Sequence, residues 1–179
     1  MILKLSMRKI YYVFILIFLI GLLIYLFYLF RPVKMVTYLG KEFYFRDDIN
    51  DAKKIPVYPD ENTVHDMFWN TNVTNITVLF KPLQSGNQYY AVENFELTYK
   101  LLIMYWMNDY NKHFSAEPID SYDNIQTSYN VLKIALVAPA FTNQTYVEGK
   151  NNVIYINAKD YRDLDLATIK TILVAMDIK

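Results

Sequence analysis

Residues 131–138 read VLKIALVA, a nearly continuous run of aliphatic and β-branched side chains that ends at Pro139. A strand with one solvent-exposed face alternates apolar and polar residues, whereas a strand covered on both faces is apolar throughout. The run therefore predicts a central strand of a mixed sheet with helices on both faces, which is a three-layer α/β fold. An α+β arrangement is the alternative.

The segments on either side of this run predict the remaining elements of the domain. Strands are expected at 35–46 (as a hairpin or a bulged strand), 55–59, 75–81, 88–92, 145–147 and 152–157. Helices are expected from Ile49, from Asp60 to Trp69, over 93–111 and at the C-terminus, with Asp163 or Asp165 as the cap of the last one.

The helix expected over 93–111 is the most apolar of the domain. Its charged residues, Glu93, Glu96 and Lys100, form one narrow polar stripe. Its large apolar residues form a line that we expect to be buried, Phe95, Tyr99, Leu102, Trp106 and Tyr110, and that Leu101, Met104 and Tyr105 widen. A helix that is apolar around so much of its circumference is either central in the fold or covered by a partner.

An uncharged run, IYYVFILIFLIGLLIYLFYLF, occupies residues 10–30. As a helix it would extend for roughly 31 Å, close to the thickness of about 30 Å of a bilayer's hydrocarbon core. We interpret it as an uncleaved signal anchor; a cleaved signal peptide would have a shorter apolar region and a small-x-small site. The chain then divides into a short basic N-terminus at 1–9, a transmembrane helix at 10–30 that contacts the lipid bilayer, and one globular domain at 31–179.

Charges flanking the run indicate its orientation. Lys4, Arg8, Lys9 and the amino terminus precede it, whereas Arg31 and Lys34 follow it. The excess of positive charge before the run favours a cytoplasmic N-terminus and a domain outside the cytoplasm, as a single-pass protein of the cell membrane. The inverted topology would make the domain a scaffold that faces the cytoplasm.

Three sequons give a second indication of an external domain. Possible glycosylation sites are Asn72, Asn75 and Asn143. About one sequon is expected by chance in a chain this rich in asparagine and threonine. Asparagine-rich loops without sugar are therefore an equally good interpretation.

Composition argues against several classes of protein. The chain has no cysteine, which excludes disulfides and thiolate metal sites, and its four glycines are too dispersed for a phosphate-binding loop. Its 18 basic and 18 acidic residues balance, and three of the basic ones precede the anchor, so the domain is slightly acidic. That charge argues against a nucleic-acid-binding face. No catalytic motif is present, and we expect no cofactor.

A group of aspartates is the one candidate for chemistry. Asp160, Asp163 and Asp165 follow a predicted strand and open a predicted helix, a position where α/β proteins often place their sites. Carboxylates there could bind a divalent cation, with His113 as a further participant. Acidic residues before helices are also common caps, which is the interpretation that we favour.

Four segments resemble a group of small uncharacterised archaeal membrane proteins. The segments are FRDDI at 45–49, IPVYP at 55–59, NFELTYKLLI at 94–103 and LDLATIK at 164–170. These archaeal proteins share one N-terminal transmembrane segment and a domain of this size. The resemblance implies that architecture and no particular activity.

Three functional hypotheses follow. The first is a binding or assembly module that is anchored in the membrane, lies outside the cytoplasm and interacts with another envelope or membrane protein. It rests on the anchor, the absence of a catalytic motif and the apolar helix over 93–111. The alternatives are a tethered metal-dependent hydrolase that uses the three aspartates, and the cytoplasm-facing scaffold.

Overall fold

The computed structural model describes residues 15–23 and 33–179 of the chain. Residues 15–23 are helical, and Val33–Lys179 form a separate compact unit. Within these two ranges no helix has the length and apolar character needed to cross a membrane. The rest of the span predicted at 10–30, and the basic segment at 1–9, lie outside the described residues.

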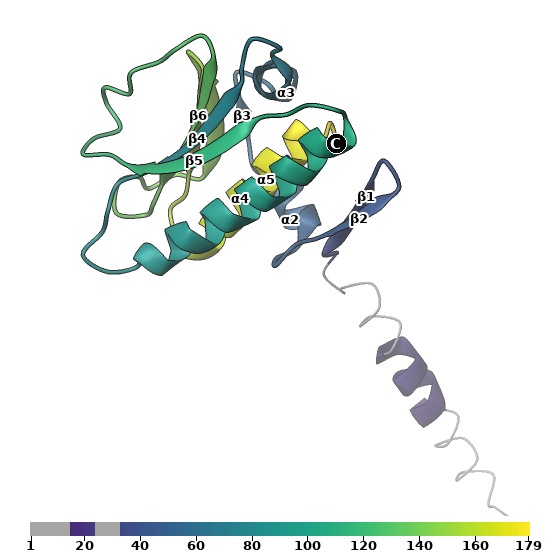
Figure 1. The fold of residues 1–179 in the computed structure, drawn as a ribbon. Helices are drawn as coiled ribbons and strands as arrows, with labels where there is room; N and C mark the ends of the chain where they lie inside the picture. The colour runs from purple at the N-terminus through teal and green to yellow at the C-terminus, as the bar shows by residue number, and fades with distance from the viewer. Residues whose placement is uncertain (1–14, 24–32) are drawn as a thin grey trace, which may run out of the picture. The chain divides into compact units, whose positions relative to one another are not determined.

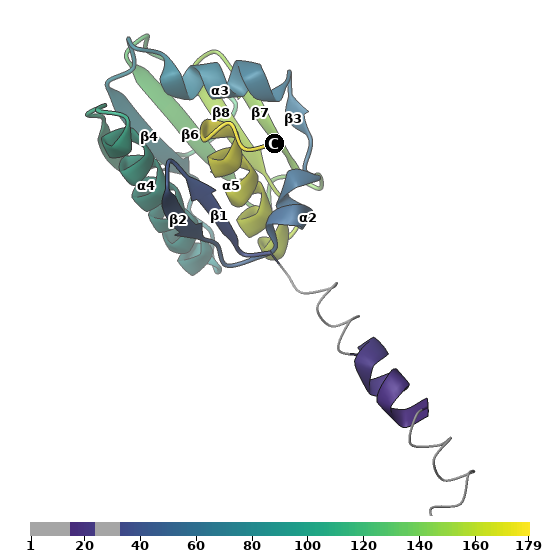
Figure 2. The same ribbon diagram turned by 90° about the vertical axis from the view of Figure 1, so that its right-hand side faces the viewer.

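A six-stranded sheet forms the centre of the Val33–Lys179 unit (Figure 2). Its strands, in spatial order, are β3 (Val57–Tyr58), β7 (Tyr146–Lys150), β8 (Val153–Asn157), β6 (Val131–Val137), β4 (Asn75–Phe80) and β5 (His113–Pro118). Within this sheet only β7 and β8 pair in antiparallel fashion, and the other four pairings are parallel. The sheet is therefore mixed and mostly parallel, which confirms the α/β class.

The helices gather on one side of this sheet (Figures 1 and 2). They are α2 (Ile49–Lys53), α3 (Glu61–Trp69), α4 (Asn87–Met107) and α5 (Tyr161–Ala175), and a hairpin of β1 (Met35–Tyr38) and β2 (Lys41–Tyr44) packs with them. The expectation of helices on both faces was wrong. The opposite face is covered in part by the loop at 119–130, through Ile119, Tyr122 and Ile125.

The path of the chain explains this asymmetry. From β4 the chain passes through α4 to β5, and it then returns across β4 to reach β6. Parallel connections are right-handed, so two crossovers that run in opposite directions lie on opposite faces of a sheet. The second crossover has no apolar periodicity and forms a loop, which leaves β6 apolar on both faces but covered by a helix on only one.

Side chains of β6 show the two sides clearly. Ile134 and Leu136 point into the main core with the helices, whereas Ala135 belongs to a small second cluster with Leu79 and Val153. Because successive residues of a strand face opposite sides, the apolar run at 131–138 serves both clusters. Burial of β6 on both faces is thus confirmed.

Capping residues define the starts of the helices. Asp48 accepts a hydrogen bond from the Asn50 amide, and Asp60 accepts one of 2.9 Å from the Thr63 amide, so α2 and α3 begin where the sequence predicts. For α5 the cap is Asp160 rather than Asp163 or Asp165.

The prediction of a strand at 88–92 was also wrong, because these residues belong to the first turns of α4. Gly86 precedes the helix with a φ of 94°, a conformation that glycine adopts without steric strain. The side chain of Asn87 accepts a hydrogen bond of 2.8 Å from the Leu83 amide and donates one of 2.7 Å to the Leu83 carbonyl. These local bonds close the turn and allow the helix to begin two turns earlier than its apolar pattern suggests.

Candidate interaction surface

The charged stripe of α4 points into the protein. Glu93, Glu96 and Lys100 are all buried, with Glu93 only 1% exposed and Lys100 4% exposed. The sequence suggested the reverse, with these residues in solvent and the aromatic line inside. The helix is therefore rotated about its axis relative to the simplest amphipathic arrangement.

Partners from the segment that follows β2 and from α4 itself make this burial possible. Lys100 forms an ion pair with Glu96, and its Nζ atom lies 4.5 Å from the centre of the Phe45 ring. Arg46 Nη1 approaches Glu93 Oε1 at 3.5 Å. Each of these contacts offsets part of the cost of removing a charge from water.

Glu93 is the least well compensated member of this group. Its Oε2 atom has no hydrogen-bond partner among the described residues, and neither has Oδ1 of Asp165 on α5. Burial, followed by the nearby negative charge of Asp165, raises the pKa of Glu93 to about 7. Burial likewise raises the pKa of Asp165. The contact between α4 and α5 thus contains two carboxyl groups whose pKa values are raised by burial.

The opposite side of α4 exposes its apolar residues. We define the α4 outer face as Val92, Phe95, Tyr99, Leu102 and Trp106, all of which are exposed. Phe95 is 66% exposed and Trp106 is 74% exposed, and the rings of Phe95 and Tyr99 stack with their centroids 5.6 Å apart. Single exposed apolar residues are common on protein surfaces, but a continuous row is typical of an interaction site.

Two further properties distinguish the α4 outer face. Its residues follow one another at intervals of alternately three and four positions, the repeat that forms the seam between two packed helices. Every charged residue of the 21-residue helix is buried, so the exposed side of α4 carries no charge. The α4 outer face can pack against an apolar, uncharged helix without burying an unpaired charge in the contact.

The three aspartates predicted as a metal site point in different directions. Asp160 caps α5 by accepting a hydrogen bond of 2.8 Å from the Asp163 amide. The Asp163 carboxylate accepts a hydrogen bond of 2.5 Å from the Thr145 hydroxyl and lies 3.4 Å from Lys159 Nζ. Asp165 is buried on the side that faces α4. In the part of the chain that the structure describes, no three histidine, aspartate or glutamate side chains are grouped so that they could hold a metal ion.

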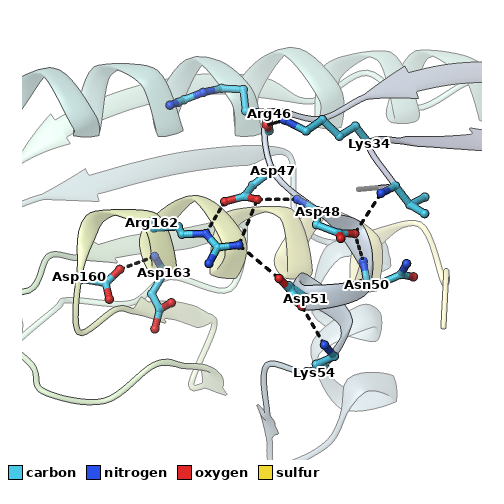
Figure 3. Close-up of polar contacts among 11 residues, drawn as sticks. Lys34, Arg46, Asp47, Asp48, Asn50, Asp51, Lys54, Asp160, Arg162 and Asp163 are labelled. Atoms are coloured by element: carbon cyan, nitrogen blue, oxygen red, sulfur yellow. Dashed lines mark hydrogen bonds and ion pairs between the residues drawn. The ribbon is translucent and has the colours of Figure 1, made fainter. Parts of the chain in front are cut away.

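A basic residue lies among the acidic groups at this end of α5 (Figure 3). Arg162 donates from Nε to Asp47 at 2.9 Å and from Nη2 to Asp51 at 3.2 Å. The guanidinium group lowers the pKa of Asp47, which stays ionised. These contacts join α5 to α2 and to the segment that follows β2.

Strand direction separates His113 from the aspartates. His113 is the first residue of β5, whereas Asp160 follows the end of β8. Strands β5, β4, β6 and β8 run parallel. His113 therefore lies at the amino ends of these strands, and Asp160 lies at their carboxyl ends. The proposed participation of His113 in a site with the aspartates is therefore wrong.

The three sequons lie at or near the surface. Asn72 and Asn143 are exposed, and Asn75, the first residue of β4, is half-buried.

Comparison of the chain with protein-family models, with curated proteins and with solved structures finds no match.

Proposed function

We propose that the chain is a membrane-anchored binding module whose α/β domain lies outside the cytoplasm and docks on another envelope or membrane protein. The α4 outer face is the observation that carries this proposal. Its apolar residues are held in solvent while the charged residues of the same helix are buried. Exposing such a row has a cost in water that contact with a partner removes.

The chemistry of the face limits the kind of partner. An uncharged row with alternating three- and four-residue spacing fits the apolar side of a second helix. Trp106 and Tyr99 are residue types that often dominate the energy of protein contacts. We therefore assign as partner an apolar, uncharged helix of another protein in the same membrane or envelope.

Site-specific photocrosslinking tests this assignment. The photoreactive residue p-benzoylphenylalanine replaces either Tyr99, on the α4 outer face, or Tyr129, an exposed tyrosine of the loop at 119–130. Full-length chains are illuminated in native membranes and adducts are identified by mass spectrometry. We expect one adduct from position 99, none from position 129, and loss of the adduct when Leu102→Glu places a charge in the row.

Three results would contradict the assignment. Equal adducts from both positions would mean that the crosslinks do not depend on α4. Survival of the adduct in the Leu102→Glu chain would mean that the apolar row does not hold the partner. An adduct consisting of two copies of this chain would show self-association in place of a different partner.

The orientation of the domain is tested separately. Positive residues before the apolar run at 10–30 support an external domain. Protease added to intact cells should then digest the domain, whereas a domain inside the cytoplasm would be protected until the cells are lysed.

A further inference from the structure

A cavity of about 430 Å³ opens on the face of the sheet that carries no helix. Its floor includes Val137 and Asn157, the last residues of β6 and β8, and Lys81 follows the end of β4 at its rim. The carboxyl ends of parallel strands are where open α/β sheets bind ligands. The volume lies within the range of about 300–1,000 Å³ that small-molecule sites occupy.

Asn157 supplies a polar group that needs a partner. Its side chain is 6% exposed and lines the cavity, and its Nδ2 atom has no hydrogen-bond acceptor among the described residues. A buried donor without an acceptor destabilises the folded protein. A ligand oxygen in the cavity would satisfy it.

The loop at 119–130 forms a firm wall of the cavity. Tyr122 donates its hydroxyl proton to the Leu136 carbonyl at 2.5 Å and accepts a hydrogen bond of 3.0 Å from the Lys81 amide. Both bonds join the loop to the ends of β6 and β4, so the cavity is formed before any ligand arrives.

Charges around the cavity balance one another. Lys81 and Lys150 contribute two positive charges, and Asp123 and Glu148 contribute two negative ones. None of the four forms an ion pair with another residue in the described ranges. A neutral ligand that both donates and accepts hydrogen bonds fits this mixture better than a strongly charged one.

Aromatic rings complete the lining. Tyr122 and Phe141 meet edge to face with their centroids 5.6 Å apart, and Tyr146 and Tyr155 line the same cavity. Burial and the charges of Glu148 and Asp123 raise the pKa of Tyr155, which keeps its hydroxyl protonated. The rings offer flat apolar surfaces beside the donors and acceptors.

We propose that this cavity binds a neutral polyhydroxylated ligand, a saccharide. Each sugar hydroxyl both donates and accepts, which matches the amide of Asn157 and the surrounding carboxylates and ammonium groups. The C–H faces of the sugar ring pack against the aromatic side chains. The site lies on the face of the sheet opposite the helices and is independent of the α4 outer face.

Ligand-observed NMR titrations of the full chain in phospholipid nanodiscs test the proposal, because detergents with sugar headgroups would compete. The probes are glucose, N-acetylglucosamine, maltose and cellobiose, with inorganic phosphate and glutamate as charged comparisons. We expect at least one saccharide to bind and neither charged probe to compete with it.

Two variants and a matched control assign the binding to this cavity. Asn157→Leu replaces the unpartnered amide by an apolar group of similar size, and it should weaken saccharide binding tenfold or more. Tyr146→Leu, which removes an aromatic wall, should weaken binding several-fold and serves if the first variant does not fold. Asn75→Leu, in a second cavity at the other end of β4, should leave binding unchanged.

Several results would overturn the proposal. They are the absence of binding by all four saccharides, binding of phosphate or glutamate in their place, and saccharide binding that is unchanged in Asn157→Leu and Tyr146→Leu.

Discussion

Helices α4 and α5 pack against each other, yet they differ in how far their apolar residues are buried. Helix α5 is buried from Leu164 to Ala175 because α2, α3, α4 and the sheet surround it. Helix α4 buries its charged residues, together with Leu97, Leu101 and Met104, and leaves an aromatic row in solvent. Burial of a helix face in this protein therefore follows from the partners available to it and not from its hydrophobicity alone.

The largest expected difference between the two helices comes from a matched pair of leucines. Leu173 on α5 is fully buried, and Leu102 on α4 is about half exposed. Leu173→Ala should lower the free energy of unfolding by about 2–5 kcal/mol because it leaves a cavity. Leu102→Ala should change it by no more than about 0.5 kcal/mol. Urea denaturation of residues 33–179 measures both, and similar losses would show that α4 is covered within the domain.

A second prediction concerns the buried charges between the helices. The pKa of Glu93 is about 7 in the folded protein, above its usual value of about 4.5. The folded state thus binds a proton at Glu93 more tightly than the unfolded state does. The stability that this proton contributes is fully present below about pH 4.5 and is lost as the pH rises through about 7. Glu93→Gln, which cannot ionise, should be more stable than the wild type by about 1–3 kcal/mol at pH 8.

Denaturation at pH 4.5 and pH 8 measures this difference, which should vanish at the lower pH. Glu96→Gln is the control, because Glu96 is paired with the buried Lys100. Its substitution leaves that ammonium group uncompensated and should destabilise the domain at both pH values. An equal stability of Glu93→Gln and wild type at pH 8 would mean that Glu93 is adequately solvated or paired.

The smallest expected effect on stability concerns the N-terminal caps, in which the two helices differ. Helix α5 begins with the Asp160 cap, whereas α4 begins after Gly86 with no capping side chain. Asp160→Ala should lower the free energy of unfolding by about 1 kcal/mol, and Asp160→Asn, which retains a capping oxygen, should have little effect. Equal losses in both variants would point to the charge of Asp160 rather than to its hydrogen bond.

Local chemistry made several features of the fold predictable. The runs at 75–81 and 131–138 became parallel strands, and Asp48 and Asp60 start helices where their spacing to the apolar residues indicates. These features depend on interactions within a few residues, which sequence patterns record directly.

The aspartates show why the candidate site was less predictable. Asp160, Asp163 and Asp165 lie within six positions, but residues of a helix advance by about 100° each, so Asp165 turns away from Asp163 toward α4. Although the three aspartates are close in the sequence, their carboxylates are therefore not grouped in space. The cavity beside Asn157 was not predicted because its walls come from β6, β7, β8, the loop at 119–130, Lys81 and Phe141, which only the folded chain brings together.

By itself, the sequence determined the α/β class, strands β4, β6 and β8, the caps of α2 and α3 and an apolar run at 10–30, because each depends on periodicity or on local hydrogen bonds. Only the tertiary structure decided which side of α4 is buried. The helix offers an exposed aromatic row and a second side on which the charged stripe lies beside apolar residues. This second side is buried, with Leu97, Leu101 and Met104 in the core and with Arg46 and Phe45 beside the charges. A charged stripe is buried only where other parts of the chain place compensating groups beside it. Which groups lie beside α4 is decided by the whole fold.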